Sequence, residues 1–295
     1  MLFPTCIRGN KIMTKRELKS ELQKAICGTA FKITSLITFL IVLWHLISIY
    51  GLMQQLPLES TPGRFTGKYN LFYWWLAIDC VSWPYVVFYS LFPFFACMPY
   101  AWSFMNDRNK KYDNQLMIRC GKRRYFFSKY LAVYISGGLV IAIPLAADLF
   151  GAALFSPASL PTVIFSMPGF SKGGFLTSLY YTQPWRFCFA FLIIEFLWGG
   201  TIAALSFVIS LIYQAKIFGI IMPPFLLYVW DTLSVILKQG YTLKTGKYLE
   251  FSVMRLIHAC TNSPNPVWLQ LSIILALTIA SGLATVVLAA KKDRI

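Results

Sequence analysis

Ionisable side chains that interrupt apolar stretches are the residues of this sequence best placed to do chemistry. They are His45, Asp148, Glu195 and Asp231. Burying a charge in apolar surroundings is costly, so each is a candidate functional residue. Glu195, in the middle of FAFLIIEFLWGG, is the strongest; its alternative role is a structural hydrogen bond to a neighbouring helix or a place in a hydrated vestibule. We expect Asp148 and Asp231 at interfacial helix ends, and His45 as a packed, hydrogen-bonded side chain.

Metal-binding motifs are missing from the sequence. It contains no H-E-x-x-H, and its seven cysteines include no C-x-x-C pair. We therefore expect no catalytic residues and no metal site. One enzymatic alternative stays open: a membrane enzyme or processing factor that uses Glu195 with His258 or Asp231. Cys80 and Cys260 are both expected on the outer side, which allows a disulfide.

The elements that must position these groups are membrane-spanning helices. Of the 295 residues, 57% are hydrophobic and only 13% charged, whereas a typical globular chain carries about 25% charged residues. Apolar runs of about 20 residues, enough to cross a bilayer, recur along the chain. The sequence predicts an all-α integral membrane protein with six spans, at residues 33–50, 81–104, 130–150, 187–212, 217–237 and 267–290.

The distribution of Lys and Arg predicts the orientation of these spans. The two termini and alternate loops carry 19 of the 27 basic residues, and the remaining loops carry 8. Cytoplasmic loops are enriched in Lys and Arg, so both termini are expected in the cytoplasm. The net charge of +16 then reports topology and contact with anionic membrane lipids, and we expect no nucleic-acid partner.

Residues 1–29 are predicted to be a cytoplasmic segment with an amphipathic helix at the membrane surface, followed by a transmembrane domain at 30–295. Thr14 and Glu17 form a capping-box pattern, which predicts that the helix begins at Thr14. Leu18, Leu22 and Ile26 then share one face, and basic residues occupy the others. Gly28 is expected to break this helix from the first span.

A basic island separates the second and third spans, in the predicted cytoplasmic loop 105–129. Tyr112, Leu116 and Met117 form an apolar stripe at helical spacing, and Gly121 is expected to stop that helix in the αL conformation. A short amphipathic helix of this kind offers its stripe to the bundle or to another protein. The basic residues around the stripe either contact a partner or only set topology; they include Arg119, Lys122, Arg123 and Arg124.

The predicted outer loops are 51–80, 151–186 and 238–266. NLFYWWLAID, before the second span, is expected to be an interfacial belt or a shallow re-entrant turn. Prolines in the second and fifth spans predict kinks or broken helices. Small residues cluster in ISGGLV and WGGTIAALS, where they favour a subunit contact, a moving surface or close packing within the chain.

Taken together, MPYAWSFMNDR, KKYDNQLMIRCGKRRYFFSKYLA and ISGGLV resemble the membrane (permease) subunit of ABC transporters of the type-two export class. In that family an acidic helix precedes an Arg- and Lys-rich turn and a K-x-L-A sequence. Asp113, Arg119 and Lys129 to Ala132 stand at the matching positions. The resemblance extends to the six spans and the preceding amphipathic helix.

The resemblance implies that the loop between spans two and three is a coupling helix seated in a separate cytoplasmic ABC ATPase, which binds ATP and magnesium. This chain would be a transport subunit without cofactors, paired with a second permease copy or paralogue in a bacterial-type cell membrane. Its cargo would be amphiphilic, such as a peptide, lipid or drug-like molecule, with Glu195 a candidate for the transport pathway. A membrane scaffold that recruits a cytoplasmic partner through the same island is a further alternative.

Overall fold

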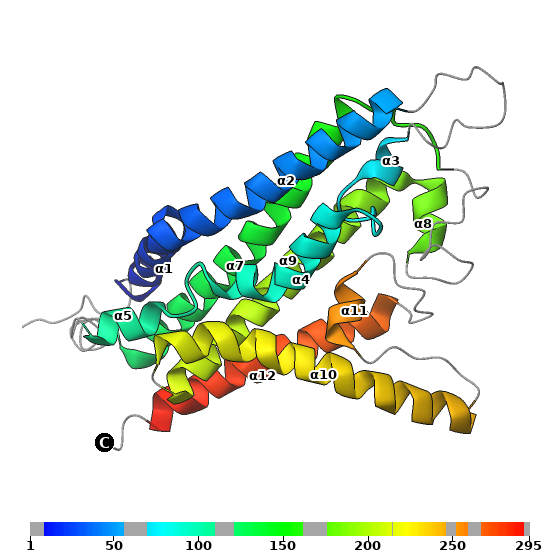
Figure 1. Cartoon of the computed structure of the whole chain (residues 1–295). Coiled ribbons are helices and arrows are strands. Elements are labelled where there is room, and N and C mark those ends of the chain that lie inside the picture. The colour runs from blue at the N-terminus through cyan, green and yellow to red at the C-terminus, as the bar shows by residue number, and fades with distance from the viewer. Residues whose placement is uncertain are drawn as a thin grey trace, which may run out of the picture.

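The chain folds as a bundle of helices (Figure 1). The computed structural model describes residues 9–55, 70–109, 121–161, 176–213, 215–245, 252–258 and 267–291. Within those ranges the backbone forms helices and turns and no strand, which confirms the predicted all-α class. The helices are α1 (Gly9–Cys27), α2 (Thr29–Gln55), α3 (Leu71–Trp74), α4 (Trp83–Cys97), α5 (Ser103–Asn109), α7 (Lys122–Ala153), α8 (Thr177–Thr182), α9 (Pro184–Tyr213), α10 (Lys216–Thr245), α11 (Val253–Ile257) and α12 (Val267–Lys291).

Five of these helices are long and apolar enough to cross a membrane: α2, α7, α9, α10 and α12. They coincide with five of the six predicted spans, and each extends beyond the predicted boundary at one end or at both. Their length follows from runs of apolar residues that no charge pair interrupts. The protein is therefore consistent with a multi-pass membrane protein.

The predicted second span, 81–104, is not one long helix. Here α4 has only 15 residues, Trp83–Cys97, and a turn separates it from α5. At 1.5 Å per residue α4 is about 22 Å long, less than the hydrocarbon core of about 30 Å. Pro84 lies at the start of α4, where its missing N–H costs nothing, and the helix ends two residues before Pro99. In the fifth span the helix runs unbroken through Pro223 and Pro224.

The centre of the bundle is α9, packed most closely against α7. Two thirds (67%) of the most apolar stretch of α9 is buried, against 17% in α10 and in α12. The glycine clusters meet at this α7–α9 contact: a Cβ at Gly199 would lie 2.8 Å from the carbonyl oxygen of Gly137. A Cβ at Gly137 would in turn collide with Ala203. Of the three roles considered for the small residues, the structure places them in close packing within the chain.

The aromatic segment before α4 is folded into the bundle at the end opposite α1 (Figure 1). The side chain of Asn70 caps α3 by accepting the N–H of Phe72 at 3.1 Å. Trp75 is fully buried and donates its indole N–H to the carbonyl oxygen of Leu145 at 2.9 Å. This burial favours a packed re-entrant turn over a belt at the surface.

The opposite end of the bundle gathers α1, α5, the start of α7 and the end of α12. Phe104, Phe126 and Phe207 form a buried cluster there, with Leu288 of α12 packed against it. The Tyr130 hydroxyl donates to the carbonyl oxygen of Thr278 at 2.8 Å, which fixes α12 beside α7. We call this the basal end. Gly28 interrupts the helix between α1 and α2, as predicted.

Candidate functional site

Glu195 lies fully buried on α9, the central helix. The hydroxyl of Tyr89, on α4, donates to its Oε1 at 3.4 Å. The other oxygen, Oε2, is buried without a hydrogen-bond partner among the described residues, and so is Nε1 of Trp198 one turn along. A buried carboxyl with an unmatched oxygen is destabilising, so it is the kind of group retained for a function.

His258, directly after α11, continues this cluster away from the basal end. Its Nδ1 lies 2.6 Å from the hydroxyl of Tyr85, one helical turn from Tyr89 on α4. The ring centroids of Tyr89 and His258 are 4.7 Å apart, and those of Tyr85 and Tyr89 are 4.6 Å apart. We name Tyr85, Tyr89, Glu195 and His258 the Glu195 cluster.

The Glu195 cluster approaches the surface at Asp231 and Arg255. These two side chains are 32% and 39% exposed, and Arg255 Nε lies 3.6 Å from Asp231 Oδ1. Ser252, at the start of α11, also donates its hydroxyl to Asp231. The structure thus brings Glu195, His258 and Asp231 into one region. Asp231 is partly exposed but lies in the middle of α10 rather than at a helix end, so the expectation of an interfacial helix end was wrong.

Sequence reasoning missed the tyrosines that join these groups. Tyr85 and Tyr89 stand four residues apart, so they share one face of α4. That spacing was a signal, but the many aromatic residues of the segment hid it.

Burial lowers the pKa of His258 to about 4, Arg255 adds to this effect, and Asp231 opposes it. The folded protein therefore keeps His258 neutral, whereas the unfolded chain protonates it near pH 6.5. We expect a stabilising contribution that is complete above pH 6.5 and is lost as the pH falls towards 4, at most about 3 kcal/mol. Thermal unfolding at pH 7.5 and pH 5 should show a larger drop for the wild type than for His258→Asn. Equal drops in the two proteins would contradict this.

His45 is held between two aspartates, away from Glu195. Its Nδ1 lies 2.7 Å from Asp148 Oδ1 and its Nε2 lies 3.4 Å from Asp79 Oδ2. Asp148 also accepts the backbone N–H of Leu76 at 2.7 Å. His45 is the packed, hydrogen-bonded side chain that was predicted. Asp148 is fully buried rather than interfacial, so that expectation was wrong; the imidazole and the Leu76 N–H stand in for the water it would otherwise need.

At the basal end Lys129 of α7 is fully buried among acidic groups. It donates to Asp107 of α5, and its Nζ lies 3.9 Å from Glu21 Oε2 of α1. Tyr125 joins them, with its hydroxyl 3.0 Å from Lys129 Nζ and 3.1 Å from Asp107 Oδ2. Glu21, Asp107 and Lys129, which we call the basal ion cluster, therefore connect three helices.

Tyr100, in the turn between α4 and α5, donates its hydroxyl to Glu21 Oε2 at 2.7 Å. Burial, and then the neighbouring Glu21, raise the pKa of Tyr100, so its hydroxyl keeps its proton. Lys24 pairs with the other oxygen of Glu21 at 2.7 Å, but its side chain is 40% exposed. Sequence reasoning missed this cluster, and had counted Lys129 only as a topology signal and as part of the K-x-L-A likeness.

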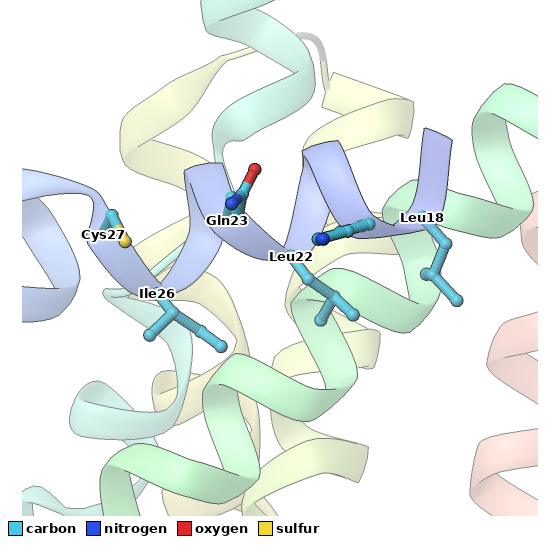
Figure 2. Close-up of a pocket in the computed structure, with 6 residues that line it drawn as sticks. Leu18, Leu22, Gln23, Ile26 and Cys27 are labelled. Carbon is cyan, nitrogen blue, oxygen red and sulfur yellow. The ribbon is translucent and has the colours of Figure 1, made fainter. Parts of the chain in front are cut away.

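The helix expected to begin at Thr14 is α1, which begins at Gly9, so the capping-box prediction was wrong. Glu21 and Ala25 face the bundle and are buried. Leu18, Leu22 and Ile26 project together from a neighbouring side of the helix, where they line a hollow of about 430 Å³ (Figure 2). The remaining lining residues are Lys19, Gln23 and Cys27.

Most of the predicted partner contact lies outside the described residues. This applies to Tyr112, Leu116, Met117 and Arg119, and on the outer side to Cys260. Lys122 is the first residue of α7, Arg123 is exposed, and Arg124 is half-buried. Gly121 has the positive φ expected of a glycine break, 80°, but its ψ of 136° is not αL, and it precedes α7 as the N-cap.

No metal-binding group of three or more His, Cys, Asp or Glu side chains occurs in the part of the chain that the structure describes. Three polar centres stand out there: the Glu195 cluster, the pairing of His45 with Asp148 and Asp79, and the basal ion cluster between α1, α5 and α7. Comparisons of the whole chain with protein-family models, curated proteins and solved structures gave no match.

Proposed function

We propose that this chain is the membrane subunit of an ATP-driven exporter whose ATPase is a separate cytoplasmic protein. The observation that carries the proposal is the basal ion cluster. It ties α1 to α5 and α7, the two helices that bracket residues 110–120. A segment held from both sides by buried charges is suited to transmit a force from a partner to the bundle, as a coupling helix does.

A second observation supports an assembly of two permease subunits. Large apolar side chains remain exposed along α10 and α12, among them Phe225, Trp230 and Leu275. Lipid would cover part of this surface, and a second permease copy or paralogue would cover another part. The cargo in this proposal is an amphiphilic molecule such as a peptide, lipid or drug-like compound.

The proposal is tested by purifying the full chain from its native membrane and identifying a stoichiometric ATPase. The double variant Leu116→Asp with Met117→Asp places two charges in the predicted contact. We expect it to weaken retention of the ATPase about tenfold or more, because truncating central apolar contacts of an interface costs 1–2 kcal/mol or more each.

Leu160→Asp is the matched control, because it adds a charge at an exposed leucine outside the predicted contact. This control should retain the ATPase as the wild type does. Unchanged retention in the double variant, or no ATPase in the purified complex, would overturn the proposal.

A second candidate function is a membrane-embedded enzyme or processing factor. The observation that favours it is the convergence of Glu195, His258 and Asp231 on one region, although the three lie in different segments of the sequence. The variant Glu195→Gln separates the two functions. If Glu195 belongs to a transport pathway, the variant should lose cargo movement while ATP hydrolysis continues. If Glu195 is catalytic, the variant should lose product formation in a preparation that contains no ATPase.

A further inference from the structure

The Glu195 cluster forms a file of polar groups through an otherwise aromatic interior. Glu195 comes from α9, Tyr85 and Tyr89 from α4, and His258 from the residue after α11. Phe88, Phe92 and Phe191 are fully buried in the same core cluster. Each of the four polar groups can bind and release a proton or carry a hydroxyl proton.

The file leads from Glu195 in the interior towards the surface. At its inner end the Tyr89 hydroxyl is 3.4 Å from Glu195 Oε1. At its other end the Tyr85 hydroxyl is 2.6 Å from His258 Nδ1, and His258 lies close enough to Asp231 and Arg255 to be affected by both charges. Asp231 and Arg255 are partly exposed, so the file ends near the surface where α10 and α11 meet. The groups that face His258 are Tyr85 and Tyr89 from α4, Asp231 from α10 and Arg255 from α11.

We propose that Glu195 is a protonation site that exchanges with the outer aqueous phase through Tyr89 and His258. In the resting state Glu195 is a carboxylic acid, because an ionised carboxylate with an unmatched oxygen is costly to bury. Release begins when the Tyr89 hydroxyl turns its proton away from Glu195 Oε1, to which it donates in the structure, and towards the imidazole of His258, whose ring centroid lies 4.7 Å from that of Tyr89. The Tyr89 oxygen then takes the Glu195 proton, while the imidazole takes the Tyr89 proton and passes one to water. One proton leaves, Glu195 becomes a carboxylate, and both relay groups return to their starting forms.

This inference goes beyond the proposed export function and does not depend on an ATPase partner. It requires only the full chain reconstituted in lipid vesicles. The readout is the infrared carbonyl stretch of a carboxylic acid, which moves when its proton is replaced by deuterium. In wild-type protein transferred to D2O we expect this band to shift, and in Glu195→Gln the band should be absent.

The path is tested by the rate of that shift. Tyr89→Phe keeps the ring and removes the hydroxyl, and His258→Phe removes the proton acceptor. Each should slow the exchange about tenfold or more, the size expected when a proton-transfer group is lost. Tyr134→Phe is the matched control: it removes a phenol hydroxyl that donates to the Leu197 carbonyl oxygen at 3.4 Å rather than to a member of the Glu195 cluster.

Two outcomes would overturn the proposal. One is a wild-type spectrum from which Glu195→Gln removes no carboxylic-acid band, since Glu195 would then not hold a proton. The other is exchange as fast in Tyr89→Phe as in Tyr134→Phe. The melting profile of each vesicle sample reports whether the variant is folded. If His258→Phe does not fold, the exchange rate of Tyr89→Phe alone tests the path.

Discussion

Replacing Lys129 with Met should destabilise the protein by about 3–5 kcal/mol, the cost of leaving buried charges without their partner. Lys129 is fully buried, and the substitution leaves Glu21 and Asp107 facing each other without a cation between them. Thermal unfolding in detergent measures the loss. Because α1 is tied to the bundle through Glu21, its backbone amides should also exchange with deuterium earlier than those of α9.

Lys24→Met is the matched control for Lys129→Met. Lys24 contacts the same glutamate, at 2.7 Å, but its side chain is 40% exposed. An exposed pair of this kind contributes about 0–1 kcal/mol. The triple variant Lys129→Met, Glu21→Gln and Asp107→Asn removes all three charges and should recover most of the lost stability. A Lys129→Met protein as stable as Lys24→Met would contradict the role of the basal ion cluster.

Replacing Asp148 with Leu should cost a similar amount, about 3–5 kcal/mol, at the other end of the bundle. The substitution removes the partner of His45 Nδ1 and the acceptor for the Leu76 N–H. Both groups are then buried without a hydrogen bond. We expect lower thermal stability together with faster amide exchange in residues 71–79, measured by mass spectrometry, because that segment loses one of its links to α7 and keeps the Trp75 indole bond to the Leu145 carbonyl oxygen.

A graded series makes the Asp148 prediction specific. Asp148→Asn keeps an acceptor for the Leu76 N–H but loses the charge facing His45, so it should fall between the wild type and Asp148→Leu. Ser48→Ala is the control, since it removes an exposed hydroxyl of α2 one turn from Trp44, whose carbonyl oxygen it contacts. Wild-type amide exchange in residues 71–79 of Asp148→Leu would show that Asp148 does not hold this segment.

Apolar run length predicted five long helices because in each of them the hydrophobic stretch and the helix coincide. It failed for the second span, 81–104, where the residues are equally apolar but the helix stops at Cys97. Hydropathy measures which residues prefer lipid and is insensitive to a turn in the backbone. Pro99 was the local signal for that break, because a proline two residues beyond Cys97 disfavours continuation of the helix.

The polar centres were harder to predict than the helices. His45 and Asp148 are 103 positions apart, and Lys129 and Glu21 are 108 apart, so no local pattern links them. Asp148 was placed at the interface because it stands near the end of an apolar run. Its actual surroundings depend on a histidine of α2 and a backbone amide before α4. Glu195 was found from sequence because a single carboxylate inside a long apolar run is conspicuous by itself.

The backbone contact between Gly137 and Gly199 has a mechanical consequence. Two helices whose main chains touch cannot slide or rotate past each other without driving a carbonyl oxygen into the facing chain. We therefore expect α7 and α9 to move as one rigid unit. This unit extends from the basal ion cluster towards residues 71–79, which Asp148 contacts. We expect the bundle to deform first in α10 and α12, whose most apolar stretches are only 17% buried, and a force applied to α5 at the base should reach the far end mainly through α7 and α9.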